Sequence, residues 1–438
     1  MHQHEHVTRP NPDPPFPGGG ITPAYAHYVL VLLFVVYVFN FIDRQILAIL
    51  LEAIKQDLGA SDTAMGFLSG FAFALFYTFA GIPIARWADH GSRRSIIALG
   101  LGLWSAMTAA SGLARTFLQL ALARVGVGVG EAAGSPPAHS LISDYFPPER
   151  RATALSIYAT GVYVGAMLAY LGGGFFVTHF DWRTAFFLVG LPGIPLALLV
   201  RLTIRELPRG HSEGAPLSAE RVGIGEVVRH LVARRSFVYL AAGASCASLG
   251  GYGILAWGPA FLGRVHGMDS VSIGAWLGPS IGLAGSAGAF LGGSIADRLG
   301  VRDRRWYLWL SAVTIAGSVP FALGFLLLGT RAGALTCFVP FYLLANMYIG
   351  PMLSMTQGLV KLRMRATASA ILLFVLNIVG LGAGPFVVGL LNDHLSGRFG
   401  PEAIRYSLSA VALMSVIAGW CFLRGSRTLR SDLRAAAG

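Results

Sequence analysis

Charged residues are scarce in this sequence. Only 12% of its 438 residues are Asp, Glu, Lys or Arg, whereas a soluble domain usually carries about 25%. A soluble chain of this length would fold into two or three domains with polar surfaces, and too little charge is present for that. Apolar residues make up 54% of the chain. Long apolar stretches, each crossing about 30 Å of hydrocarbon, explain this composition better.

Cysteine and lysine are also rare. Cys246, Cys337 and Cys421 lie inside apolar stretches, and their spacing fits no zinc site or disulfide framework, so no metal or cofactor is expected. Lysine occurs only as Lys55 and Lys361, and the net charge of +12 comes almost wholly from arginine. The arginines lie between apolar segments rather than in a patch with interleaved aromatic residues, so a nucleic-acid partner is not expected.

Twelve apolar segments are candidate transmembrane helices, which predicts an all-α membrane protein. Its 56 glycines would be damaging in soluble helices but let membrane helices pack closely. The predicted spans are residues 25–51, 63–86, 94–114, 116–142, 152–178, 183–203, 236–262, 272–296, 306–329, 332–360, 366–392 and 404–423.

The longest loop divides these spans six and six. We therefore predict a disordered N-terminal tail over 1–24, a six-helix bundle over 25–203, a linker loop over 204–235, a second six-helix bundle over 236–424 and a tail over 425–438.

The distribution of basic residues predicts the orientation. If both termini are cytoplasmic, 24 of the 33 lysines and arginines lie on the cytoplasmic side, 7 lie opposite and 2 lie inside spans. Cytoplasmic loops of membrane proteins carry such an excess. The short loops and arginine-rich usage are compatible with a bacterial inner membrane, and we expect a monomer.

The two halves of the chain resemble each other. The segment Arg151-Ala-Thr-Ala154 before the fifth span recurs as Arg365-Ala-Thr-Ala368 before the eleventh, and Pro137 matches Pro351 at the same offset. The short loop around Asp89 is repeated around Asp297. These matches indicate a duplicated six-helix unit, and such repeats place a substrate site between the halves near the bilayer midplane.

A six-plus-six arrangement with an acidic-basic loop after helix 2, repeated after helix 8, resembles the major facilitator superfamily. The first loop departs from the family pattern at Ala85, His90 and Ser92, and the family's proline-glycine antiporter motif is not met in helix 5. The resemblance implies a cytoplasmic gate that pairs when that side is closed. Its charged residues would be Asp89, Arg93, Asp297 and Arg298.

Four further segments resemble the spinster family of lipid transporters. They are Asn40-Phe-Ile-Asp43-Arg44, Arg124-Val-Gly-Val-Gly-Val-Gly-Glu131-Ala, Leu207-Pro-Arg-Gly210 and Ala256-Trp-Gly-Pro-Ala-Phe261. This resemblance implies transport of lysophospholipid-like or sphingosine-1-phosphate-like amphiphiles, often coupled to protons. Organic-anion symporters of the same superfamily share the helix 1 and helix 4 patterns, so those two segments alone leave both readings open.

Four charged residues lie deep inside predicted spans, where a charge is costly and therefore points to function. Arg124 and Glu131 are seven residues apart, which places them on one face of a helix about 10 Å apart, and His139 lies farther along that face. Asp43 and Arg44 are adjacent on another span. The charges have no counterparts in the second half, so the chemistry is expected to be asymmetric.

The buried charges suggest a proton switch. Burial raises the pKa of a carboxylate and a nearby arginine lowers it, so Asp43 and Glu131 would take up protons when their arginines move away. Arg44 and Arg124, with His139, would then bind an anionic head group, because guanidinium groups suit phosphate. The alternative is a static ion-pair network that only fixes one helix against another.

Polar and aromatic side chains inside the spans would line the substrate cavity. Competing interpretations are organic-anion symport, multidrug efflux and, from another class, a membrane sensor or an intramembrane enzyme, although the chain has no catalytic motif such as His-Glu-x-x-His. The predicted lining residues are Asn40, Tyr252, Trp257, Asn346, Tyr348, Gln357 and Asn377.

Overall fold

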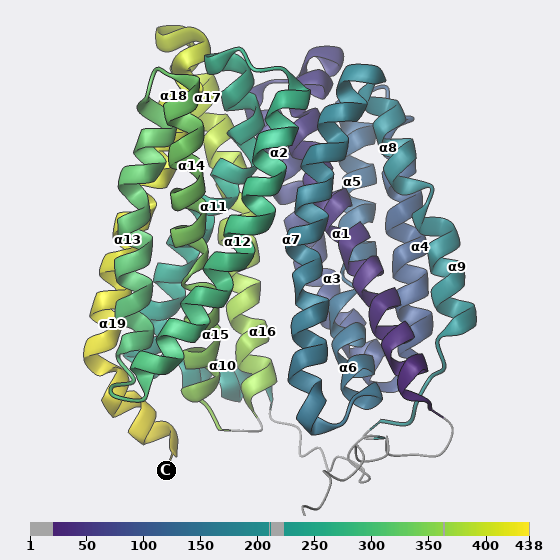
Figure 1. Ribbon diagram of the computed structural model, residues 1–438, viewed down its shortest axis with the longest axis vertical. Coiled ribbons are helices and arrows are strands. Elements are labelled where there is room, and N and C mark those ends of the chain that lie inside the picture. The colour runs from purple at the N-terminus through teal and green to yellow at the C-terminus, as the bar shows by residue number, and fades with distance from the viewer. Residues whose placement is uncertain (1–20, 210, 212–222, 362–363, 438) are drawn as a thin grey trace, which may run out of the picture.

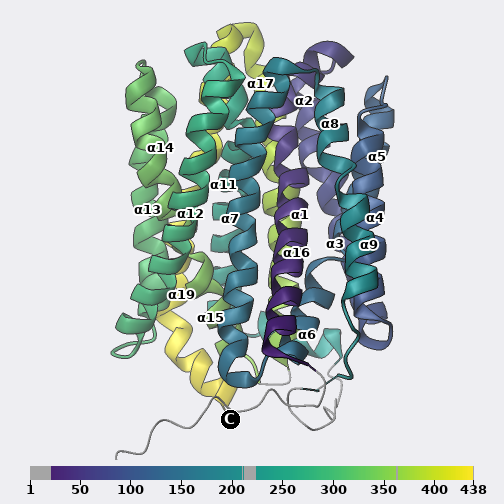
Figure 2. The same ribbon diagram turned by 45° about the vertical axis from the view of Figure 1, so that its right-hand side comes forward.

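A computed structural model describes residues 21–209, 211, 223–361 and 364–437 of the chain. Every regular element in this part is a helix, and the helices stand side by side in two groups (Figures 1 and 2). The first half comprises α1 (Pro23–Leu58), α2 (Asp62–Ser69), α3 (Phe71–His90), α4 (Arg93–Ser111), α5 (Phe117–Glu131), α6 (Ser135–Tyr145), α7 (Pro148–His179), α8 (Trp182–Gly190) and α9 (Gly193–Thr203).

The second half repeats this plan after a short helix in the linker. It comprises α10 (Ile224–Val232), α11 (Arg235–His266), α12 (Ser270–Gly300), α13 (Trp306–Leu327), α14 (Arg331–Asn346), α15 (Ile349–Gly358), α16 (Arg365–Leu376), the π-helix η2 (Asn377–Ala383), α17 (Gly384–Phe399), the 3₁₀-helix η3 (Gly400–Glu402), α18 (Ala403–Ala412) and α19 (Met414–Ala437).

The internal repeat is visible in the helix breaks. The fourth span breaks between α5 and α6, and the tenth breaks between α14 and α15. The second segments start at Ser135 and at Ile349, a difference of 349 − 135 = 214 residues, which is the offset between the repeated sequence motifs.

Fewer of the described helices are long and apolar enough to cross a membrane than the twelve spans that the sequence predicts. Eight described helical segments are apolar enough to cross a membrane, and the last of them, 365–436, includes both the eleventh and the twelfth spans. The third, fourth and eighth predicted spans are not among these segments; the fourth contains Arg124 and Glu131 and is broken between α5 and α6.

The predicted boundaries shift at three places. Residues 1–20 of the predicted tail lie outside the described residues, and α1 already begins at Pro23, where Thr22 accepts a hydrogen bond from the Tyr25 amide as the helix N-cap. The predicted linker contains α10, while its residues 212–222 are not described. At the other end, α19 continues through the predicted boundary at 424 to Ala437.

Both ends of the described chain lie at the same end of the molecule, at the bottom of Figure 1. We call this the terminus end and the opposite one the far end. The halves are in contact from the far end inward, where α7 packs on α12 and α2 packs on α17. Glycines allow this approach, since a Cβ at Gly274 would lie 2.2 Å from the Tyr170 carbonyl oxygen and one at Gly70 would lie 2.2 Å from the Gly382 oxygen.

The terminus end is different. There α6 packs against α1, α3, α4 and α7 of its own half, and α15 packs against α12, α13 and α16 of the other. Among the described helices, α6 and α15 are not one of the closely packed pairs. The halves are therefore joined mainly toward the far end and are more loosely packed against each other at the terminus end.

Candidate functional site

The four buried charges form two ion pairs between α1 and α5. An Arg44 guanidinium nitrogen lies 2.7 Å from Glu131 Oε2, and the Arg44 Nε–H donates to the same oxygen at 3.2 Å. The Arg124 guanidinium donates to Asp43 Oδ1 at 2.9 Å, and the Thr108 hydroxyl from α4 donates to Oδ2 of the same carboxylate. We call these four charges the charge cluster.

The helix geometry explains why there are two pairs rather than one. Adjacent residues on α1 point about 100° apart, so Asp43 and Arg44 reach two partners separated by two turns of the neighbouring helix. The exposed fractions of the Asp43, Arg124 and Glu131 residues are 2%, 2% and 1%. With two cations and two anions, the charge cluster is neutral, which limits the cost of its burial.

Aromatic rings enclose Arg44. Its guanidinium carbon lies 4.8 Å from the centroid of Phe41, 4.9 Å from that of Phe73 and 4.8 Å from that of Tyr77. Such cation–π contacts stabilise a cation in a desolvated place. Arg44 therefore keeps favourable contacts even when its carboxylate is protonated.

Two atoms of the charge cluster lack partners. Among the described residues, Glu131 Oε1 and Arg124 Nε are buried and make no hydrogen bond. A buried polar atom without a partner is costly. The cluster is therefore not fully satisfied, and Glu131 has a free oxygen on which a proton can be placed.

A cavity of about 240 Å³ lies between the halves. Most of its lining comes from the second half, with Phe41, Gln45 and Tyr163 among the contributors from the first. Its described lining side chains include no Asp, Glu, Lys, Arg or His; hydroxyl, amide, aromatic and aliphatic groups make up the wall. We call this space the central cavity.

Four of the residues predicted to line the substrate cavity do line the central cavity: Tyr252, Asn346, Tyr348 and Asn377. Asn377 is the first residue of η2, and π-helical turns are frequent at functional sites. Sequence reasoning missed Gln45, Tyr163 and Tyr342. Gln45 directly follows Asp43 and Arg44 in α1, and this position could have indicated that it lies at the site. The two tyrosines lie in apolar segments, and nothing else in the sequence distinguishes them from packing residues.

Three predicted lining residues lie elsewhere. Asn40 is buried beside the charge cluster, where its side-chain oxygen accepts a hydrogen bond from Arg44 at 3.5 Å. Trp257 is fully buried and donates its indole N–H to the Pro385 carbonyl at 2.9 Å. Gln357 donates to Ser369 at 3.2 Å near the terminus end. None of the three is among the described residues that line the central cavity, so a lining role for them is not seen in this conformation and stays a prediction.

A small second pocket adjoins the central cavity. Arg44 and Arg124 line it, and Gln45, Tyr252 and Leu255 contribute to the walls of both spaces. Toward the far end, a third cavity of about 330 Å³ is lined by Ala48, which also borders the second pocket, and by the Glu52 and Arg264 side chains. The three spaces follow one face of α1 from the middle of the molecule to the far end.

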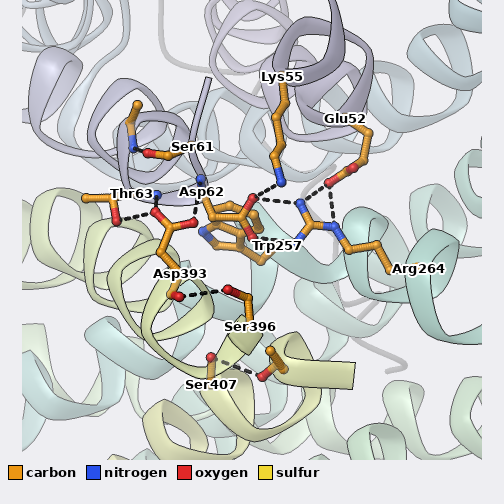
Figure 3. A network of polar contacts seen from close by, with 12 residues as sticks. Glu52, Lys55, Ser61, Asp62, Thr63, Trp257, Arg264, Asp393, Ser396 and Ser407 are labelled. Carbon is orange, nitrogen blue, oxygen red and sulfur yellow. Dashed lines mark hydrogen bonds and ion pairs between the residues drawn. The ribbon is translucent and has the colours of Figure 1, made fainter. Parts of the chain in front are cut away.

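An ionic network joins the halves at the far end (Figure 3). Arg264 of α11 donates to Glu52 of α1 at 2.9 Å through Nε and to Asp62 of α2 at 2.5 and 2.9 Å. Lys55 pairs with Asp62 at 2.5 Å. Asp393 of α17 accepts hydrogen bonds from the Asp62 and Thr63 amides at 3.1 and 2.8 Å. We call these six residues the far-end network, which the sequence did not single out.

The predicted gate residues at the terminus end bond within their own halves. Arg93 is completely buried and donates to Asp144 and, at 2.8 Å, to Glu206. Asp297 accepts a hydrogen bond from Tyr307 at 2.7 Å. Arg298 is exposed, and the side chain of Asp89 lies outside the described residues. A pairing of these charges across the halves stays a prediction for the state in which the terminus end is closed.

His139 lies apart from the charge cluster. It is exposed on α6, and its ring contacts that of Tyr158 of α7 edge-on at 5.3 Å. Its predicted membership of the head-group network is therefore not seen in this conformation.

Comparison with known proteins identifies the family. The pattern of the Major Facilitator Superfamily matches residues 33–385. The chain belongs to the major facilitator superfamily. The predicted family, the all-helical fold and the transport class are thereby confirmed, and this superfamily member is an integral membrane transporter rather than an enzyme.

The relatives of this chain include an efflux pump and spinster proteins. An MFS-type efflux pump from Mycolicibacterium smegmatis is 35% identical and the match covers 94% of this chain and 95% of that protein. Protein spinster homolog 1 from Homo sapiens is 28% identical, covering 95% and 84%. A crystal structure of a bacterial homolog to the human lysosomal transporter Spinster, inward-facing and unoccupied, has a TM-score of 0.86 and 32% identity, covering 94% and 99%.

Proposed function

We propose that this chain is a proton-coupled secondary transporter that moves a single-tailed, lipid-like amphiphile by alternating access. The observation that carries the proposal is that an uncharged, largely apolar cavity shares a wall with a pocket lined by Arg44 and Arg124. An acyl chain fits the first environment and an anionic or zwitterionic head group fits the second. Lysophospholipids and sphingosine-1-phosphate-like molecules have this chemistry.

The proton is the proposed coupling ion. Glu131 and Asp43 hold the two arginines in ion pairs, and protonation of a carboxylate would release its arginine for the head group. The free Oε1 of Glu131 supports Glu131 as the first carboxylate to be protonated. A static network would instead keep both pairs through the cycle.

The orientation follows the positive charge. We place the terminus end in the cytoplasm of a bacterial inner membrane because 24 of the 33 basic residues belong to that side. The looser packing of the halves at that end then corresponds to a cytoplasm-facing conformation. The protein works as a monomer, since both halves of the site come from one chain.

A test uses purified protein in liposomes with an imposed pH gradient and a fluorescent lysophospholipid as the probe. We expect gradient-driven flux in the native protein and its loss in Glu131→Gln and Asp43→Asn. Asp269→Asn is the matched control, because Asp269 caps α12 at the exposed far end. If both buried variants transport like the native protein with unchanged pH dependence, the proton-switch proposal fails.

Multidrug efflux is the second candidate, favoured by the likeness to the mycobacterial efflux pump. The tyrosine-rich wall of the central cavity, with Tyr163, Tyr252, Tyr342 and Tyr348, would also accept flat organic cations. Ethidium as a parallel probe separates the two: efflux of ethidium without movement of the lysophospholipid favours this candidate.

A further inference from the structure

The third cavity lies at the far end and, at about 330 Å³, is larger than the central cavity. We call it the far-end cavity. Its described lining comes from α1, α11, α12 and the loop between the last two. Within the described part of the chain, its charged lining residues are Glu52 and Arg264. The proposed proton coupling uses neither of them.

Glu52 has one oxygen free for a ligand. Arg264 donates to Glu52 through Nε at 2.9 Å and through Nη2, and both hydrogen bonds end on Oε1 (Figure 3). Among the described residues no donor reaches Oε2, and the exposed fraction of the Glu52 side chain is 32%. An ionised carboxylate has about four lone-pair sites. Glu52 can therefore accept a further donor from the far-end cavity.

The charges around Glu52 decide which ligand fits. Arg264 also donates to Asp62 at 2.5 and 2.9 Å, and Lys55 pairs with Asp62 as well. A cation that binds Glu52 leaves no charge of this group unpaired, because Arg264 keeps Asp62. An anion that draws Arg264 away would leave Glu52 without a cation in a partly buried place, which is costly. The far-end cavity thus favours a cation over an anion.

The rest of the wall favours a primary ammonium group on an apolar chain. Gln56 lies one turn beyond Glu52 on α1, and Ser270 begins α12, so an amide oxygen and a hydroxyl add acceptors. A primary ammonium has three N–H donors for such oxygens, whereas a trimethylammonium group has none and is usually bound by aromatic faces. The described lining includes no aromatic side chain. Its apolar members include Ile49, Met268 and Ile273.

We propose that the far-end cavity is a second ligand site, which binds the primary ammonium group of a single-chain amine through Glu52 in competition with Arg264. The ammonium donates to Glu52, with Gln56 and Ser270 as further acceptors, and the apolar chain lies against the aliphatic wall. This site lies outside the charge cluster. It does not depend on the proposed proton coupling.

A binding experiment on the purified protein in lipid nanodiscs tests the site with hexylamine as the probe. Hexylamine is protonated at neutral pH, and hexyltrimethylammonium is the matched probe without N–H groups. Ligand-detected NMR titrations give the dissociation constant of each. Hydrogen bonds between charged groups are strong, so we expect hexylamine to bind about tenfold more tightly than its trimethyl counterpart and Glu52→Gln to weaken hexylamine binding by about tenfold or more.

Glu402→Gln is the matched control, because Glu402 is also a far-end glutamate paired with an arginine, Arg405 at 2.7 Å, but within the second half. Gly263→Leu blocks the site without changing a charge. A Cβ at Gly263 would lie 3.8 Å from the Met268 carbonyl oxygen and 4.0 Å from Ile273 Cδ1, which are ordinary contact distances. The leucine side chain would therefore occupy the far-end cavity, and hexylamine binding should be lost.

Arg264→Gln tests the competition. Removal of the guanidinium frees Glu52, so hexylamine should bind more tightly, by up to about fivefold for a partly exposed ion pair. If Arg264 only maintained the shape of the cavity, binding would weaken instead, and that result would overturn the competition.

Equal affinities of the two probes, or unchanged hexylamine binding in Glu52→Gln and Gly263→Leu, would overturn the site. Loss of binding in Glu131→Gln but not in Glu52→Gln would place the ammonium group at the charge cluster and overturn it too. We expect Glu131→Gln to bind hexylamine like the native protein. The far-end site can therefore be confirmed even if the transport test rejects proton coupling.

Discussion

Arg264→Gln is expected to open the far end. Arg264 is the cation of the far-end network that spans the two halves, and the exposed fractions of the Arg264, Asp62 and Glu52 side chains are 16%, 4% and 32%. Exposed ion pairs contribute about 0.2–1 kcal/mol, and breaking a buried pair costs about 3–5 kcal/mol. Arg264 lies between these limits, and Lys55 still pairs with Asp62 after the substitution.

We therefore estimate a loss of about 2 kcal/mol for the state in which the far end is closed. At about 1.4 kcal/mol per factor of ten, this changes the ratio of closed to open molecules by about 30-fold. A population that is about 1% open would become about 20–25% open. The shift is large enough to measure as a change in the distance distribution between two labels.

The assay is pulsed electron spin resonance with nitroxides at Arg115→Cys and Gly329→Cys, after removal of the native cysteines. These positions are exposed at the far end of the first and second halves. Arg183→Gln is the control, because Arg183 pairs with Asp57 at 2.8 Å within the first half. A longer-distance population in Arg264→Gln and not in the control is expected. Equal distributions in both would refute the assignment of the far-end network as a closure of this end.

Two further substitutions have separable outcomes. Burial raises the pKa of the Glu206 carboxyl, but hydrogen bonds from Arg93, the Arg94 amide and a serine outweigh burial and hold the pKa below its usual range. The ionised Glu206 therefore stabilises the fold at pH values above the usual pKa of a glutamate. This stabilisation is lost as the pH falls through the lowered pKa of the folded state. Glu206→Gln should lower the Tm at neutral pH, with the difference shrinking in acid, and a constant difference would contradict this. Trp257→Phe removes the indole hydrogen bond to the Pro385 carbonyl and should cost about 1 kcal/mol in thermal unfolding, with KM for the probe unchanged. A raised KM would place Trp257 at the substrate.

The sequence predicted the charge cluster because buried charges are conspicuous in an apolar chain. Asp43, Arg44, Arg124 and Glu131 stand out for this reason alone, and their spacing on two helices already implied more than one partner. By contrast, the amide and tyrosine groups of the central cavity resemble ordinary packing residues in sequence. Trp257 shows the difficulty, since its indole serves helix packing and not the cavity.

Composition and the internal repeat were thus enough to determine the class of protein, its twelve helices and the asymmetry of its charges. Charged residues stand out in the sequence because burying a charge in a bilayer is costly. The duplication can be recognised because its motifs recur at a constant distance along the chain. The pairing of these charges and the far-end network were decided by tertiary structure. Each depends on the rotation of one helix against another, and Arg264 of α11 meets Glu52 of α1 only because the two halves close at that end. Such contacts join residues far apart in the chain, so they cannot be predicted from a local sequence pattern.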